Sequence, residues 1–438
     1  MTLTEAAFWT KRFGVIALGA FVVFVIVILA VTLQKADVMP PQYLTANYAC
    51  TEKREEFLEN KLEIPSLKLA DGSEMVFEIL TDSGKIDALP GIVNVYRFNN
   101  PTQSLSAQAN AKILANKLGF DPESVIRRTD SYVWVDRDTN RNLVVQAKNL
   151  NFQLTTESSF IKELSAKESL PSVADAKAKA ANVLVGLGLY SDDYAKSNHA
   201  TKLIGVNPDG TFKKVNSLDE ADLIRVDFVR TKSLITIPSN IVGADAMIQS
   251  LVRKMGDDAH RVESLIINDE RVEIHTFNTF GIYPQSQKSN ISVYIGAENR
   301  DNKKDSYASV HRIDYTYWPV NIESCGTYEL ISPQVAIEKV QSGEGSLVYL
   351  VEGGGDDIIE YTPKRVKKFS VTDVLLAYYE DREELEYLQP VYYIIGEAIF
   401  ENDTKGIFEY LYPAISYDIV QNKIVLPDVV IEEKGGLL

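Results

Sequence analysis

The chain has 438 residues, a formal net charge of −16 at pH 7 and a hydrophobic content of 45%. A charge this negative repels nucleic acid and anionic membrane surfaces, so we exclude nucleic acid as a partner. The hydrophobic content is typical of a folded protein and not of a disordered stalk. The length exceeds what a single hydrophobic core usually fills, so two or three modules are expected.

The most apolar stretch of the chain is residues 13–33, FGVIALGAFVVFVIVILAVTL. A helix of this length spans about 30 Å, the hydrocarbon thickness of a bilayer. Lys11 and Arg12 precede it and only Lys35 follows closely, so the positive-inside rule predicts a cytoplasmic tail at 1–12. The sequence therefore predicts a single-pass protein of the cell membrane, with a signal anchor and an extracytoplasmic body.

The polar segment 34–60 is predicted to be a tether. After it, three stretches repeat one theme, a short helix followed by strands, and are predicted as modules at 61–160, 165–326 and 327–420. The end of the chain, 421–438, is predicted to be a terminal strand and tail.

Each predicted module has one helix with recognisable end signals. Alanines at helical spacing within 107–118 are followed by a glycine. Ser172 is a plausible N-cap for a helix over 173–188. Pro333 occupies the first helical position before 334–343, where its missing N–H costs nothing.

The order of these elements predicts the fold class. A helix followed by strands joined through short turns favours α+β modules, each with a helix packed on an antiparallel meander. We find no alternating βαβ rhythm and no glycine-rich strand-to-helix turn, so a doubly wound parallel sheet is not expected.

The motif search finds no catalytic constellation. Ser159 and Lys162 match S-x-x-K, the Ser–Lys acyl-enzyme motif, but no K-T-G follows. No two histidines have metal-ligand spacing in the sequence. The histidines are His199, His260, His275 and His311. We therefore expect no catalytic residue, no cofactor and no metal site, and we do not expect an enzyme.

One segment resembles the start of a calcium-binding loop, with Asp136, Asp138 and Asn140 at alternate positions. Such a loop needs glycine at its sixth position and a bidentate glutamate at its twelfth. Arg141 and Ala147 occupy these positions, so a solvated hairpin turn is the better interpretation.

The C-terminal strands are unusually rich in tyrosine. Both alternating faces of VLLAYY and PVYYII are apolar or aromatic, so this sheet is expected to be covered on both sides. The helix at 334–341 would cover one face. A sister module, the interpretation we favour, or a partner or ligand would cover the other. The candidate interaction surface is formed by Tyr378, Tyr379, Tyr392 and Tyr393.

The C-terminal region also resembles a known family. The helix that starts at Ser332-Pro333 and contains Ala336, the segment LLAYYEDREELEYLQPVYYIIGEA and the closing GIFEYLYPAI are similar to PepSY-like extracytoplasmic domains. The nearest named examples are the YycH/YycI-type membrane-anchored regulators of the WalK sensor kinase. ANKLGF, SYVWVD, NFQLTT and RIDYTYWPV are similar to uncharacterised single-pass bacterial membrane proteins that repeat this unit.

The resemblance implies a protein that binds or inhibits other proteins and carries no catalytic residues. The predicted function is therefore a non-catalytic, membrane-anchored binding or regulatory protein of the bacterial cell envelope, with a protein partner in the envelope. The alternatives are a structural or assembly subunit of an envelope complex and, less favoured, a cell-wall hydrolase or transferase. Cys50 and Cys325 could pair outside the membrane, but two cysteines far apart do not establish a disulfide framework.

Overall fold

The structure is a computed structural model of the chain, which divides into two units, 1–45 and 46–438. The described residues all belong to the second unit and are 46–50, 59–81, 84, 86, 89–194, 199–267, 270–284, 289–299, 307–353 and 361–418. The predicted cytoplasmic tail, the segment 13–33, most of the tether and the tail 421–438 lie outside the described residues.

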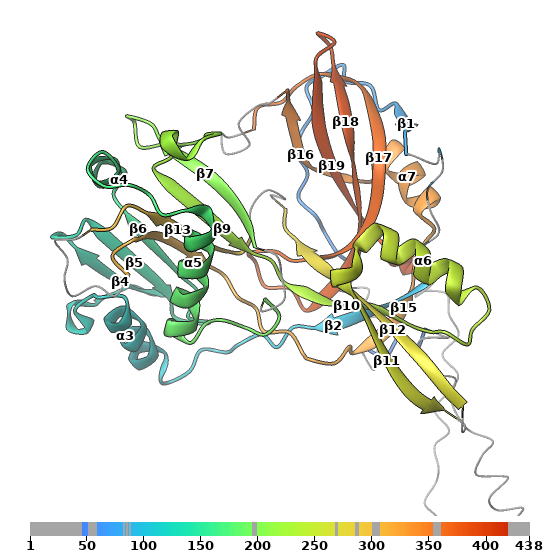
Figure 1. The fold of residues 1–438 in the computed structure, drawn as a ribbon, viewed down its shortest axis with the longest axis horizontal. Coiled ribbons are helices and arrows are strands. Elements are labelled where there is room, and N and C mark those ends of the chain that lie inside the picture. Colours follow the sequence, from blue (N-terminus) through green and yellow to red (C-terminus); the bar gives the residue numbers. More distant parts are fainter. Residues whose placement is uncertain are drawn as a thin grey trace, which may run out of the picture. The chain divides into compact units, whose positions relative to one another are not determined.

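The first of two large sheets has ten strands (Figure 1). Six of them follow the order β10–β12–β17–β18–β19–β16. In addition, β1 pairs with β17, β11 with β12, and β2 with both β15 and β18. The strands are β1 (Phe77–Ile79), β2 (Ile92–Arg97), β10 (Thr231–Pro238), β11 (His260–Ile267), β12 (Glu270–Ile282), β15 (Gly326–Glu329), β16 (Ser346–Glu352), β17 (Val366–Tyr379), β18 (Tyr387–Phe400) and β19 (Lys405–Pro413).

The second sheet has nine strands in the order β3–β4–β5–β6–β14–β13–β9–β7–β8. Its neighbouring strands are antiparallel throughout. The strands are β3 (Ile126–Arg127), β4 (Ser131–Asp136), β5 (Arg141–Gln146), β6 (Phe152–Thr156), β7 (Ala200–Val206), β8 (Phe212–Lys214), β9 (Leu223–Phe228), β13 (Ile291–Gly296) and β14 (Val310–Tyr315).

Five α-helices lie among the described residues: α3 (Ala107–Lys117), α4 (Ser158–Ser165), α5 (Val173–Leu187), α6 (Ala244–Met255) and α7 (Pro333–Gln341). The three predicted helices are confirmed as α3, α5 and α7. The predicted N-cap Ser172 forms, because its Oγ accepts from the N–H of Asp175 at 3.1 Å. Pro333 begins α7 as predicted, and Ser332 before it also caps the helix, since its Oγ accepts from the N–H of Val335 at 3.2 Å. The sequence analysis did not find α4 or α6.

Helices cover the nine-stranded sheet on both faces. On one face α3 and α5 share a buried cluster with alternate strand residues such as Val293. On the opposite face Ile161 of α4 packs with Tyr294, the next residue along β13. Since neighbouring residues of a strand point to opposite faces, both faces of this sheet contribute to buried clusters.

The predicted fold class of tandem PepSY-like modules, each a helix on its own antiparallel meander behind a transmembrane helix, is wrong. Strands of the segment 61–160 lie in both sheets, since β2 pairs with β18 and β6 pairs with β14. The physical reason is that one short helix cannot cover the apolar face of two long strands. The nine-residue α7 is only about 14 Å long and cannot cover β17 and β18, which have 14 residues each. Strands from distant segments bury the remaining apolar surface. The residue limits predicted for the modules stay a prediction.

The prediction of a membrane protein with a single transmembrane helix and a signal anchor is also corrected. No helix among the described residues is long and apolar enough to cross a bilayer. The longest of them, α5, has 15 residues. The stretch 13–33, on which the prediction rested, lies outside the described part of the chain.

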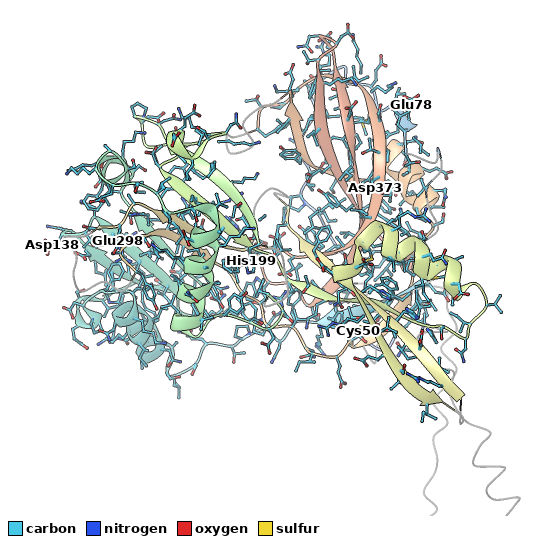
Figure 2. The ribbon with its side chains drawn as sticks, viewed as in Figure 1. Cys50, Glu78, Asp138, His199, Glu298 and Asp373 are labelled. Carbon is cyan, nitrogen blue, oxygen red and sulfur yellow. A yellow bond between two sulfur atoms is a disulfide. The ribbon has the colours of Figure 1, made fainter. Side chains whose placement is uncertain are left out.

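Cys50 and Cys325 form a disulfide, with their Cα atoms 4.6 Å apart. Cys50 is labelled in Figure 2. The bond joins the start of the described chain to the residue before β15, and both cysteines lie in or against a buried cluster that includes Val95 and Tyr328. The pairing that the sequence left open is therefore present.

Candidate binding cleft

The four predicted interface tyrosines lie in the ten-stranded sheet but do not form one exposed surface. Tyr378 and Tyr392 belong to the large cluster that includes Ile337 of α7, whereas Tyr379 and Tyr393 contribute to a cluster on the other face. Tyr378, Tyr379 and Tyr392 are each at most 1% exposed.

Other parts of the same chain cover these rings. The Tyr378 hydroxyl donates to the backbone oxygens of Asn94 in β2 and Ser233 in β10, at 2.9 and 3.0 Å. The Tyr392 hydroxyl donates to the backbone oxygen of Ile331, just before α7. The double-sided apolar pattern of these strands thus corresponds to internal packing and not to a surface that is open to a partner.

The two residues of the S-x-x-K pattern, Ser159 and Lys162, form ordinary structural contacts. Ser159 Oγ donates to Glu157 at 2.8 Å, while Lys162 Nζ pairs with the buried carboxylate of Asp222, also at 2.8 Å. Each side chain of the S-x-x-K pattern is therefore engaged with a carboxylate.

The calcium-like segment is the β4–β5 turn, where Asp138 is labelled in Figure 2. The Asp136 carboxylate accepts from the N–H of Asp138 at 3.0 Å and from the Thr139 hydroxyl at 2.6 Å. These local bonds are those of a turn-stabilising aspartate.

Two histidines that are distant in sequence meet in the β11–β12 hairpin. The His260 Nε2 and His275 Nδ1 atoms are 2.9 Å apart, and the His260 ring stacks on Phe277. Sequence spacing alone could not show this pair, because the β11–β12 register creates it. Within the described residues, no group of three or more metal-ligating side chains could hold a metal ion.

A cavity lies where β12 and β17 separate. The two strands pair in parallel only at 281–282 with 378–379, whereas β1 pairs with β17 at 369–371. Because β18 occupies the other edge of β17, residues 372–377 have no partner strand on this edge among the described residues. This split in the sheet defines what we call the α6 cleft.

Helix α6 forms one wall of the cleft through Leu251, Lys254 and Met255. It lies between Gly243 and Gly256, whose φ angles of 82° and 81° suit glycine. Ala244, Ile248 and Leu251 are buried on one side of the helix and pack with Ile235, Ile237 and Phe277. This packing places the end of α6, with Lys254 and Met255, at the cleft.

The cleft has a volume of about 780 Å³, within the range of ordinary ligand-binding sites. Most of its lining is apolar: Leu89, Val229, Leu234, Leu251, Met255, Ala259, Phe280, Leu375 and Leu376. The polar and charged lining residues are Thr231, Lys254, Asp258, Arg261, Asn278 and Thr279. An apolar floor with a few polar groups is the usual composition of a binding pocket.

Side chains take the place of a strand along the separated edge of β17. The Thr279 hydroxyl donates to the Leu376 oxygen at 2.6 Å, and Lys254 Nζ donates to the Val374 oxygen at 3.3 Å. Lys254 also lies 3.7 Å from Asp373, which Figure 2 labels on β17. The backbone of β17 is thus held by two side chains that another hydrogen-bonding chain could replace.

A buried charge network lies next to the cleft, centred on Arg230 between the lining residues Val229 and Thr231. Arg230 donates from Nε to Glu380 at 2.7 Å, from Nη1 to Asp193 at 2.6 Å and from Nη2 to the Trp318 oxygen at 2.7 Å. Burial raises the pKa of the Glu380 carboxyl, although the Arg230 charge opposes this shift. Gly281 is required here, since a Cβ atom would lie 2.6 Å from Glu380 Oε1.

The sequence analysis missed this cleft because its residues come from five separate segments of the chain. One local signal was available. Ala244, Ile248 and Leu251 have the i, i+4, i+7 spacing of an amphipathic helix, with a glycine on either side. The separation of β12 from β17 has no comparable signal, since it depends on strand pairing.

Comparisons with known proteins add little. No protein-family profile and no curated protein matches the chain. Among solved structures, it is similar to the crystal structure of an uncharacterized protein from Eubacterium rectale, with 11% identity and a TM-score of 0.34. The similarity covers 78% of this chain and 87% of the other. At this TM-score we draw no conclusion about fold or function from it. The resemblance to PepSY-like domains stays a prediction.

Proposed function

We propose that the protein is a non-catalytic binding or regulatory protein of the cell envelope that holds an extended, largely apolar segment of a partner protein in the α6 cleft. The observation that carries this proposal is the cleft itself, an apolar cavity of about 780 Å³ beside a strand edge without a partner strand in the described chain. The resemblance to domains that bind or inhibit other proteins agrees with it.

The disulfide supports the envelope as the compartment. Structural disulfides persist in oxidising environments and are rare in the cytosol. The bond between Cys50 and Cys325 joins segments that are 275 residues apart in sequence, and its surroundings are buried. An extracytoplasmic location accounts for such a bond directly.

The strand edge favours an extended peptide over a compact small molecule. Residues 372–377 belong to the strand β17, which pairs with β18 on one edge. On the other edge their backbone groups can form hydrogen bonds with an added extended chain. Leu375 and Leu376 point to opposite faces of the sheet and both line the cleft. A bound strand could therefore place apolar side chains on either side of the edge.

The charges at the cleft indicate which extended peptides it should bind best. Lys254 and Arg261 line the cleft together with a single acid, Asp258, although the whole chain is strongly acidic. A segment with apolar residues and one carboxylate would match this lining better than a basic segment.

The test is a selection of short random peptides displayed on phage against the immobilised full-length protein. Enriched peptides are synthesised, and their Kd is measured by fluorescence anisotropy for wild type and for Met255→Glu. We expect apolar peptides with an acidic residue, and about tenfold weaker binding or more to Met255→Glu, because a carboxylate would be introduced into an apolar lining.

The matched control is Leu105→Glu, which introduces the same charge at a fully exposed leucine away from the cleft. Its Kd should equal that of wild type. If Met255→Glu lowers the melting temperature, Leu375→Gln serves as the second cleft variant. Peptides that bind the cleft variants and wild type equally, or a selection without enrichment, would refute the proposal.

The second candidate, a structural or assembly subunit of an envelope complex, is favoured by one observation, the exposed edge strand β11. Assembly subunits present such edges to other subunits. The two functions differ in what is bound, since a regulator holds a peptide in the cleft whereas an assembly subunit joins a stable complex.

A further inference from the structure

Strand β11 is an edge of the ten-stranded sheet. Its eight residues pair with β12 on one side, and no other described strand pairs with it. Figure 1 shows the β11–β12 hairpin extending past α6. Every residue from 261 to 266 is exposed, including Val262 at 48%, Leu265 at 49% and Ile266 at 79%.

This edge has little of the usual protection against pairing. Natural edge strands carry charged side chains, especially lysine, or proline or a bulge, or are very short. β11 reads HRVESLII, without lysine or proline, and its register with β12 is unbroken over eight pairs. Its two permanently charged residues, Arg261 and Glu263, have opposite signs, and no ion pair forms at either within the described residues.

We propose that two copies of this chain associate through β11, paired antiparallel with Val262 on the two-fold axis. In this arrangement the two sheets join into one continuous sheet. The inference rests on the charge pattern of β11. Arg261 also lines the α6 cleft, whereas Val262 and Glu263 do not, so the Glu263 variant tests the dimer without changing a cleft residue.

Symmetry restricts the possible registers. A two-fold axis that relates neighbouring antiparallel strands is perpendicular to the sheet, so it leaves each side chain on its own face. Residues directly opposite one another must also share a face. Only registers that are centred on a residue meet both conditions. The four middle positions of β11 are Val262, Glu263, Ser264 and Leu265.

The charges select among these registers. With Val262 on the axis, Arg261 of each copy lies opposite Glu263 of the other, which forms two cross-strand pairs of opposite charge. With Glu263 on the axis, the two glutamates oppose each other, which is destabilising. With Ser264 on the axis, Glu263 lies opposite Leu265 and the charges have no partners. With Leu265 on the axis, Glu263 lies opposite Ile267, and Arg261 has no residue of β11 opposite it. The first register satisfies both charges and places the exposed Val262 against its copy.

The test measures the mass of the full-length protein by sedimentation equilibrium over a range of concentrations. We expect a reversible monomer–dimer equilibrium for wild type. Arg261→Glu and Glu263→Arg should each weaken dimerisation about tenfold or more, because like charges then face each other twice. The double variant with both reversals should restore the wild-type dissociation constant.

The control is Arg137→Glu, the same charge reversal at an exposed arginine of the β4–β5 turn in the other sheet, which should leave dimerisation unchanged. The proposal is overturned if wild type stays monomeric at all concentrations. It is also overturned if single reversals have no effect on the dimer, or if the double reversal fails to restore it.

Discussion

Arg230 and Glu380 form an ion pair in which Nε and Oε1 are 2.7 Å apart and both side chains are at most 2% exposed. Arg230 lies between β9 of the nine-stranded sheet and β10 of the ten-stranded sheet, and Glu380 follows β17. The pair therefore ties the connection between the two sheets to the end of β17. The same arginine lies 5.2 Å from the centroid of the Tyr317 ring.

Removal of one partner of this network should be costly. Arg230→Met leaves the buried carboxylate of Glu380 without its ion-pair partner, whereas Asp193 keeps its ion pair with Lys232 at 3.0 Å. We expect a loss of about 3–5 kcal/mol in unfolding free energy. Glu380→Gln keeps a hydrogen-bond acceptor for Arg230 and should cost less. Chemical denaturation of the full chain measures both, and equal stability of Arg230→Met and wild type would contradict the prediction.

The disulfide should contribute to stability. A loop-entropy estimate for a closure of 275 residues is roughly 5.6 kcal/mol, and measured values are often smaller. Purified protein should show no thiol that reacts with a maleimide in denaturant until a reductant is added. The double variant Cys50→Ser/Cys325→Ser should melt at a lower temperature. Two reactive thiols in unreduced protein would rule the bond out.

Helix α7 should depend on its buried face. Ala336, Ile337 and Val340 are each at most 4% exposed and belong to the main cluster of the ten-stranded sheet. Ile337→Asp would bury an unpaired charge and should cost several kcal/mol in the full chain. Val335→Asp, on the exposed side of the same helix, is the control. Similar melting temperatures for the two variants would argue against this packing.

Stability should depend on the charge of Lys202 on β7. Burial, with a smaller effect from Arg225, lowers the pKa of Lys202 from 10.5 to about 8. Between these pH values the unfolded chain binds a proton that the folded chain does not, so this group adds stability as the pH rises from about 8 to 10.5. The stability it adds is complete above pH 10.5 and is lost as the pH falls through about 8.

The variant Lys202→Met removes this dependence. Relative to wild type, its melting temperature should be highest below pH 8, and the difference should shrink as the pH approaches 10.5. Lys213→Met, at an exposed lysine on the neighbouring β8, is the control for loss of a surface charge. A difference between Lys202→Met and wild type that does not change with pH would contradict the assignment.

Short-range signals in the sequence were sufficient for part of the structure. The ends of α5 and α7 follow from Ser172 and Ser332, whose hydroxyls bond to backbone groups three residues along the chain. The β4–β5 hairpin was likewise predicted from two apolar runs on either side of a polar turn. These features depend on neighbours within one or two turns of the chain, so composition and spacing are enough to locate them.

The tertiary structure decided the rest. Only strand pairing over long distances places β2 beside β18, and the fold class depends on that pairing. The tyrosines of β17 and β18 signalled a sheet that is covered on both faces, but the sequence could not show that β2, β10 and α7 provide cover. The α6 cleft, the Arg230–Glu380 pair and the disulfide each join residues more than 100 positions apart. Their formation depends on the burial gained by the whole chain, which no local pattern records.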